Sequence, residues 1–221
     1  MVSYDSDAEL FEVIRRHLYT PVLGDSLDAL GRLHQFLPPE LKSIGPDMTL
    51  VGRCMPVLVA DVFGPQLRPF GRLTEALDQL QPGDIYLART SQTPCAAWGE
   101  LLTATAIARG AAGAVIDGYH RDTPQILAQG FPVFSRGGYA QDGAVRAAVI
   151  DYRIAIDVGR VHVSPGDLIV GDRDGLVVVP QDVEQEVIEM ALVKAAAENV
   201  VKQAIEGGMS STMAFETYGV L

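Results

Sequence analysis

Apolar residues near the start of the chain follow helical spacing. Over residues 7–18 they recur every three or four positions, which predicts an amphipathic helix that Pro21 brings to an end. Residues 24–31 predict a second, short helix with Asp25 or Ser26 as its N-cap.

The middle of the chain alternates between strand and helix patterns. Residues 48–59 have strand character, and Pro56 within them predicts an edge strand or a bulge. Three short apolar runs then alternate with two helical segments, which is the pattern of parallel β-α-β units. The strands are predicted over residues 85–88, 113–116 and 131–134, and the helices begin at Gly99 and Thr123 and end at Gly110 and Gly130.

After Val149 the pattern changes to short apolar runs separated by turns, which predicts β-hairpins. A long helix is then predicted from Val183 to about Glu206, stopped by two glycines. The tail that ends at Leu221 is apolar, so we expect it to pack on this chain or on a neighbouring subunit.

These segments fit a single domain over residues 1–221, because a chain of 221 residues with 48% hydrophobic residues can bury one sizeable core. Its parts are N-terminal helices over 1–45, a β-α-β core over 46–150, β-hairpins over 151–180, and the C-terminal helix and tail over 181–221.

Composition narrows the function classes. The formal net charge of −11 disfavours direct binding to nucleic acid, although it leaves a basic protein partner open. Two cysteines are too few for a disulfide scaffold or a zinc ribbon. The N-terminus is acidic where a signal peptide is basic, and no apolar run approaches the roughly 20 residues of a membrane span. We therefore expect a cytoplasmic protein that does not enter membranes.

The candidate chemistry lies between Trp98 and Asp122. The helix start at residues 99–102 offers backbone N–H groups that can bind a carboxylate or phosphate. The loop after the next strand carries Arg121 and Asp122, and with Glu100 they would suit Mg²⁺ or Mn²⁺ holding a 2-oxo acid. The alternative is a solvated turn with a weak surface ion pair. The pattern alone leaves both interpretations open.

The run GELLTATAIARGAAGAVIDGYHRD, residues 99–122, resembles the core motif of the RraA-like family, which includes divalent-metal-dependent 4-hydroxy-4-methyl-2-oxoglutarate aldolases. The segments VLGDSLDALGR, VHVSPGDLIVGDRDGLVVVP and SSTMAFETYGVL are also similar to that family, so the likeness covers nearly the whole chain. The active members carry a carboxylate, twenty residues and then Arg-Asp. Here residues 101–120 separate Glu100 from Arg121, although the family's usual residue at the first position is Asp.

The resemblance implies a fold and a reaction. The fold is a single-domain layered α/β/β sandwich of the swivelling phosphohistidine-domain type. The reaction is that of a class II aldolase, which cleaves 4-hydroxy-2-oxo diacids to pyruvate and decarboxylates oxaloacetate through the same enolate. The implied site roles are metal binding by Asp122, enolate stabilisation by Arg121, substrate binding at Gly99, Leu101 and Leu102, and orientation of water around the metal by Glu100.

The resemblance also implies an assembly, a homotrimer or homohexamer in which a glutamate of the C-terminal helix reaches a neighbour's site. Glu198 is the best match and Glu206 the second. A different class of function stays open, because some relatives are regulators that bind and inhibit an RNA-degrading endonuclease without catalysis. A third hypothesis is a lyase or hydrolase of another 2-oxo acid, with Tyr119, His120 and Arg136 in the pocket wall.

Overall fold

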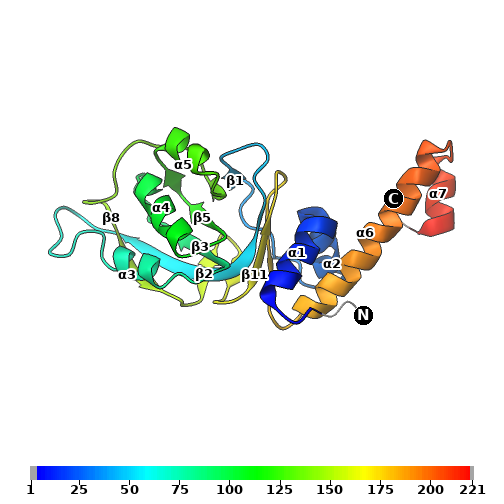
Figure 1. The fold of residues 1–221 in the computed structure, drawn as a ribbon, viewed down its shortest axis with the longest axis horizontal. Coiled ribbons are helices and arrows are strands. Elements are labelled where there is room, and N and C mark those ends of the chain that lie inside the picture. The colour runs from blue at the N-terminus through cyan, green and yellow to red at the C-terminus, as the bar shows by residue number, and fades with distance from the viewer. Residues whose placement is uncertain (1–3, 220–221) are drawn as a thin grey trace.

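A curled mixed sheet forms the centre of the protein in the computed structural model, which describes residues 4–219 (Figure 1). The helices are α1 (Asp7–His17), α2 (Thr20–Ala29), α3 (Leu73–Asp78), α4 (Glu100–Ala108), α5 (Thr123–Gln129), α6 (Glu184–Glu206) and α7 (Ser211–Tyr218). The strands are β1 (Lys42–Ser43), β2 (Leu50–Asp61), β3 (Asp84–Arg89), β4 (Ala96–Trp98), β5 (Gly113–Asp117), β6 (Tyr119–His120), β7 (Val133–Ser135), β8 (Ala147–Tyr152), β9 (Ile156–Val158), β10 (Val161–Val163), β11 (Leu168–Gly171) and β12 (Leu176–Val179).

The main sheet runs in the order β1-β7-β5-β3-β2-β11-β12, and β8 also pairs with β2. Strands β2, β3, β5 and β7 are parallel, which confirms the predicted β-α-β units. Strands β11 and β12 form the predicted antiparallel hairpin. Two small sheets, β4-β6 and β9-β10, lie outside the main one.

Three buried clusters hold the layers together. One lies between the parallel strands and helices α3, α4 and α5, and it includes Leu77, Ala106 and Ile126. The second packs α1, α2 and α6 on β11 and β12. The third joins the main sheet to the β9-β10 hairpin through apolar residues such as Val158 and Val161. Helices, sheet and hairpin therefore form the α/β/β layering that the sequence analysis predicts.

Two predictions about the N-terminal helices are wrong. Pro21 stands in the first turn of α2 and begins that helix instead of ending the one before it. The physical reason is that an N–H in a helix's first turn has no intrahelical partner, so proline loses nothing there. Asp25 and Ser26 lie inside α2, and the Ser26 hydroxyl donates to the Val22 carbonyl at 2.9 Å.

Pro56 does not mark an edge, because β2 is a central strand. On one side of β2 the pairing with β11 ends at Arg53, and the pairing with β8 begins at Val57. Pro56 falls in this gap, so its missing N–H removes no ladder bond. The predicted bulge is present just beyond, where the register shifts between Leu58 and Val59.

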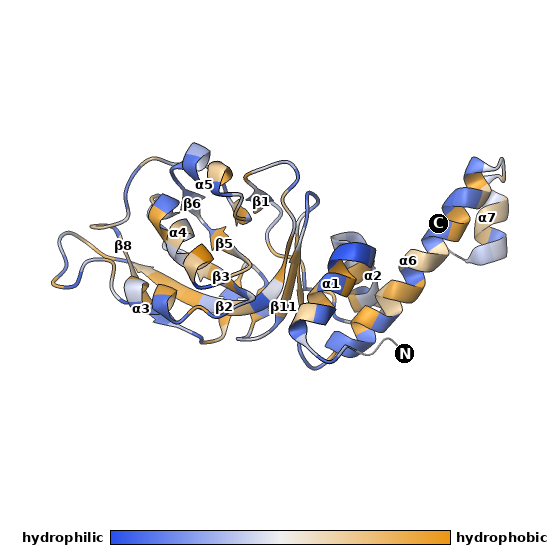
Figure 2. Cartoon of the chain, in the orientation of Figure 1, coloured by the Kyte–Doolittle hydropathy of each residue, from blue (hydrophilic) through white to orange (hydrophobic). Residues whose placement is uncertain are grey.

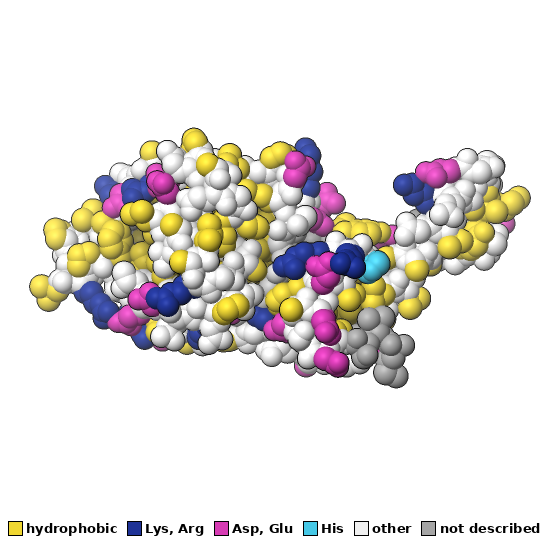
Figure 3. Space-filling model, in the orientation of Figure 1, with side chains coloured by type: hydrophobic (Ala, Val, Ile, Leu, Met, Phe, Trp, Pro, Cys, Tyr) yellow, Lys and Arg dark blue, Asp and Glu magenta, His cyan; other side chains and the backbone are white. Residues whose placement is uncertain are grey.

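Helix α6 extends away from the rest of the protein and carries α7 at its end (Figure 1). Hydrophobic ribbon is concentrated in the main sheet and alternates with hydrophilic ribbon on α6 (Figure 2). Figure 3 shows hydrophobic side chains on the surface of this arm, which we define as α6 and α7. Exposed apolar residues on it include Val193, Val200, Met213 and Phe215. The apolar tail forms α7, which packs on α6 of the same chain. Leu221 lies outside the described residues.

Candidate functional site

The small sheet of β4 and β6 brings the two ends of the central motif together. These strands pair in parallel, and the Arg121 amide donates to the Trp98 carbonyl at 3.0 Å. Helix α4 begins directly after β4, and the Arg121-Asp122 turn directly follows β6. The Glu100 amide donates to Asp122 Oδ2 at 3.1 Å, so a carboxylate lies on the positive end of α4. The sequence-predicted neighbours therefore share one site.

Asp122 is held in an unusual backbone conformation. Its φ of 59° is left-handed, which is uncommon for a residue other than glycine. The side chain is 39% exposed, and only Oδ2 is engaged by the Glu100 amide. A Cβ at Gly99 would stand 2.7 Å from this oxygen, so any larger residue there would push the carboxylate out of its position.

Arg121 is positioned by a carboxylate that the sequence analysis missed. Its Nη1 lies 3.0 Å from Asp142 Oδ1, whereas its Nε lies 3.7 Å from Asp122 Oδ2. Asp142 comes from the loop before β8, and a single bridge to Ala96 places it beside β4. No periodic pattern or spacing marks this residue in the sequence.

A cavity of about 550 Å³ joins these groups to the protein's interior. Its mouth is polar and is lined by Glu100, Arg121, Asp122 and Asp142. Its inner part is apolar, and the residues there include Val59, Leu73, Leu77, Tyr86 and Trp98. The amides of Leu101 and Leu102, which also line it, belong to the first turn of α4 and so have no intrahelical acceptor.

His120 lies behind the site and fixes the turn. It is 3% exposed, with Nδ1 at 2.7 Å from Ser135 Oγ and Nε2 at 2.8 Å from Thr123 Oγ1. Burial lowers the pKa of its imidazole, so the ring is neutral at pH 7. These bonds connect β6, β7 and the first residue of α5 on both sides of Arg121 and Asp122.

The donor set fits a hard divalent cation that keeps most of its water. Mg²⁺ commonly takes one or two carboxylates from a protein and fills its other positions with water or substrate. A half-exposed Asp122 with one oxygen oriented by a helix amide, beside the exposed Glu100, matches that requirement. Within residues 4–219 no group of three or more His, Cys, Asp or Glu is arranged to enclose a metal ion. A metal here would thus rely on very few protein ligands.

Other predicted residues lie elsewhere. Tyr119 and Arg136 line a separate polar cavity of about 910 Å³. Arg136 pairs there with Asp117 at 2.7 Å. Neither Arg136 nor Tyr119 lines the cavity of the candidate site. Glu198 lies on α6 and accepts a hydrogen bond from the hydroxyl of Tyr19, the residue before α2. Glu206 is the last residue of α6. Within one chain both glutamates are outside the candidate site, and their reach into a neighbour's site stays a prediction.

The model of the RraA-like family, described as aldolase/RraA, matches residues 20–178. The chain belongs to the RraA-like family. A protein of Halalkalibacterium halodurans named "Putative 4-hydroxy-4-methyl-2-oxoglutarate aldolase" is 30% identical over 202 residues, 90% of each chain. Protein DlpA of Legionella pneumophila is 33% identical over 199 residues, which are 89% of this chain but only 32% of DlpA. The chain therefore spans about a third of that relative's length.

A solved structure supports the same family. RraAS2 of Streptomyces coelicolor, described as an unusual member of the RNase ES inhibitor RraA protein family, superposes with a TM-score of 0.77. It is 25% identical and covers 91% of this chain and 99% of its own. The expected RraA-like α/β fold is therefore confirmed. The RraA-like family contains both proteins named as aldolases and proteins named as inhibitors, so membership alone does not assign an activity.

No helix within residues 4–219 has the length and hydropathy needed to cross a membrane.

Proposed function

We propose that this RraA-like protein is a carbon–carbon lyase that forms pyruvate from 4-hydroxy-2-oxo acids, such as 4-hydroxy-4-methyl-2-oxoglutarate, and from oxaloacetate. The observation that supports this most is the position of Asp122 and Arg121 at the amides that begin α4, in the mouth of one cavity. The 30% identical relative named as an aldolase supports the same reaction class.

Cleavage of a 4-hydroxy-2-oxo acid breaks the bond between C3 and C4. The C4 hydroxyl loses its proton, C4 becomes a carbonyl, and the electron pair of the broken bond moves into the pyruvate enolate. Protonation of C3 then gives pyruvate. Oxaloacetate has no C4 hydroxyl to deprotonate: its ionised C4 carboxylate leaves as carbon dioxide, the electron pair of the C3–C4 bond moves into the same enolate, and protonation of C3 gives pyruvate.

The residues of the site match the charges of this reaction. The amides of Leu101 and Leu102 bind the substrate carboxylate, and the Arg121 guanidinium donates to the oxygen that becomes negative in the enolate. Asp142 holds that guanidinium in place. Glu100 is exposed at the mouth and holds the water that takes and returns the proton. Asp122 would hold a Mg²⁺ or Mn²⁺ ion, which would supply Lewis-acid polarisation of the 2-oxo group.

The assignment is tested by pyruvate release from oxaloacetate and 4-hydroxy-4-methyl-2-oxoglutarate, with Mg²⁺ or with EDTA. We expect release by the wild type with the metal, and a loss of at least about 100-fold with EDTA or in Asp122→Ala, because one interaction at the developing charge contributes about that much. Asp157→Ala is the matched control, since Asp157 is exposed and pairs only with His162. Wild-type turnover by Asp122→Ala would contradict the proposal.

A second candidate function is the inhibition of an RNA-degrading endonuclease by protein–protein contact. The net charge of −11 favours docking on a basic surface, and RraAS2 is described as belonging to a family of such inhibitors. Binding to an endonuclease that weakens with added salt, together with no pyruvate release under any metal condition, would favour this function over the lyase.

A further inference from the structure

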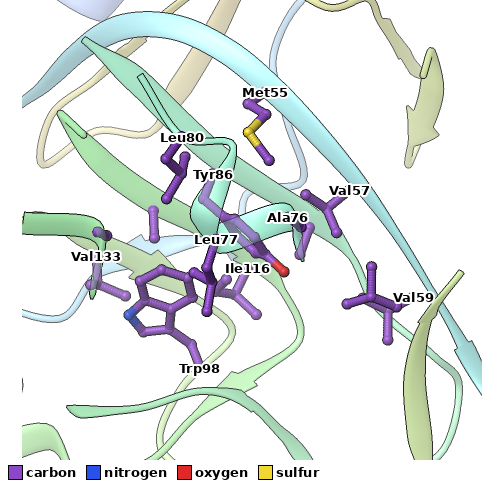
Figure 4. Packing of buried hydrophobic residues seen from close by; sticks show 14 of the residues in the cluster. Met55, Val57, Val59, Ala76, Leu77, Leu80, Tyr86, Trp98, Ile116 and Val133 are labelled. Carbon is purple, nitrogen blue, oxygen red and sulfur yellow. The ribbon is translucent and has the colours of Figure 1, made fainter. Parts of the chain in front are cut away.

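The inner part of the cavity contains a polar group without a partner. Tyr86 is 1% exposed and packs its ring against Trp98, with 5.0 Å between the ring centroids and the ring planes tilted by 47°. Its hydroxyl makes no hydrogen bond with any residue in the range 4–219. The hydroxyl oxygen is not fully enclosed by protein atoms, so its remaining accessible surface opens into the cavity that Tyr86 lines. Figure 4 shows this oxygen on the side of the cluster nearest Val59.

Because this hydroxyl opens into the cavity, water can bind it in the free protein, and a ligand that displaces the water must offer an acceptor in its place. Burial raises the pKa of the Tyr86 phenol, which therefore remains a neutral donor at physiological pH. The groups beside it in the cavity, such as Val59 and Leu77, are apolar and offer it no acceptor.

The charges around the cavity restrict the substrate further. Among the lining residues that the structure describes, Arg121 is the only cation, and it lies at the mouth next to Asp142. The other charged lining residues, Glu100, Asp122 and Asp142, are all acidic. A second substrate carboxylate in the inner part would be desolvated without a cation, and one phenol hydrogen bond does not offset that cost.

We propose that the inner cavity selects a 2-oxo acid whose C4 carries an uncharged, mainly apolar substituent with one acceptor oxygen, and that Tyr86 is the specificity-determining donor to that oxygen. The inference rests on the proposed lyase function for the position of the 2-oxo acid end, and it ranks substrates with an apolar C4 substituent above the diacids, which the same site still cleaves. A cavity of about 550 Å³ is large enough for such a substituent, since ligand pockets run from roughly 300 to 1,000 Å³.

The first test is binding, measured by isothermal titration calorimetry with compounds that lack the C4 hydroxyl and so are not cleaved. The probes are 2-oxoglutarate, 4-phenyl-2-oxobutanoate and 4-(4-methoxyphenyl)-2-oxobutanoate, each with Mg²⁺. We expect the two aryl compounds to bind at least about tenfold more tightly than 2-oxoglutarate, and the methoxy compound to bind most tightly of the three. Preferential binding of 2-oxoglutarate would overturn the inference.

The second test removes only the hydroxyl. Tyr86→Phe keeps the ring that packs on Trp98, so we expect the methoxy compound to bind on the order of tenfold more weakly and the phenyl compound to bind within about twofold of wild type. Tyr152→Phe is the control, because Tyr152 packs on the same core cluster but does not line this cavity. Equal loss for both aryl compounds, or no loss for either, would overturn the role of Tyr86.

The third test adds a cation and does not depend on Tyr86. Thr74 is exposed at the cavity rim on α3, and we expect Thr74→Lys to raise affinity for 2-oxoglutarate about tenfold relative to the aryl compounds.

Exchange of the pyruvate methyl protons with deuterium separates this inference from the lyase proposal, because the exchange needs no substituent at C4. Exchange by the wild type together with a preference for diacids would overturn the inference alone, whereas absence of exchange would overturn the lyase proposal.

Discussion

Gly99 shows how a single position shapes the site. Its φ of −166° is ordinary extended backbone, so the need for glycine arises from space and not from conformation. Asp122 Oδ2 occupies the volume into which any Cβ at this position would project. The absence of one side chain thus lets a carboxylate reach the amides at the start of α4.

Gly99→Ala should therefore displace Asp122 while leaving the fold intact. We expect kcat/KM for pyruvate formation to fall by about 100-fold, because misplacement of a catalytic group by about 1 Å has an effect of that order. The midpoint of thermal unfolding should change little, since the clash is with a half-exposed side chain. Gly175→Ala is the control, as its Cβ would meet nothing within 4 Å. Full activity of Gly99→Ala would show that the close approach is unimportant.

The sequence is informative about some residues of the site and silent about others. The proximity of Glu100, Arg121 and Asp122 is predictable, because α4, β5 and β6 follow one another and the pairing of β6 with β4 returns the chain to the start of α4. Asp142 and Tyr86 are not, because their relation to the site depends on tertiary packing alone. Asp142 arrives through one bridge to Ala96, and Tyr86 has the ordinary pattern of a buried strand residue.

At the scale of elements, Arg53 of β2 connects two helices to the main sheet. Its Nη2 lies 2.5 Å from Asp7 Oδ1 at the start of α1, and it also binds Glu184 at the start of α6. The Glu184 side chain is 11% exposed, and the Arg53 guanidinium pairs with it there. The hydrogen bond from Arg53 lowers the pKa of the Asp7 carboxyl below its ordinary 3.8.

Arg53→Met should lower the free energy of unfolding by about 3 kcal/mol at pH 7, because it leaves a buried carboxylate unpaired. A carboxyl with a lowered pKa in the folded state stabilises the fold above its unfolded pKa and loses that effect as the pH falls through the folded value. The difference between variant and wild type in urea unfolding should therefore shrink as the pH falls below about 4. Arg16→Met, whose ion pair with Glu12 is exposed, should change stability by less than about 0.5 kcal/mol. A constant difference from pH 7 to pH 3 would contradict this account of Arg53.

Element types were predictable where the local pattern was strong, as in α1, α4, α6 and the β11-β12 hairpin. Strand β9 and helix α7 are not predictable as separate elements, because each is short and depends on packing against a neighbour. Pro56 is misleading in the sequence, since a gap between two partner strands removes the cost of proline in a way that local sequence cannot reveal.

At the scale of the whole molecule, the arm of α6 and α7 leaves apolar side chains without cover. Val193 on α6 is 72% exposed, and Phe215 on α7 is 58% exposed. Clusters of exposed apolar residues of this kind are typical of association surfaces. The arm also carries Glu198, the residue expected to reach a neighbouring site, so association and activity are expected to be linked.

The wild type should therefore form a homotrimer or homohexamer in light scattering coupled to size exclusion, and Val193→Asp should shift it toward the monomer with a parallel loss of pyruvate formation. The reason is that a charge on the arm would be desolvated in an association surface. Leu67→Ser should change neither property, because Leu67 is fully exposed on the loop after β2 and lies off the arm. A wild type that remains monomeric at tens of micromolar would contradict this role for the arm.

The proposed function requires Asp122, Arg121 and the start of α4 to stabilise the enolate of a 2-oxo acid with a divalent metal. It is tested most directly by following the pyruvate methyl signal by proton NMR in D₂O, with Mg²⁺ or Mn²⁺ and with EDTA. We predict that the wild type exchanges these protons for deuterium only with the metal and that Asp122→Ala does not. Exchange that is unaffected by EDTA and by Asp122→Ala, or no exchange by the wild type at all, would contradict the account.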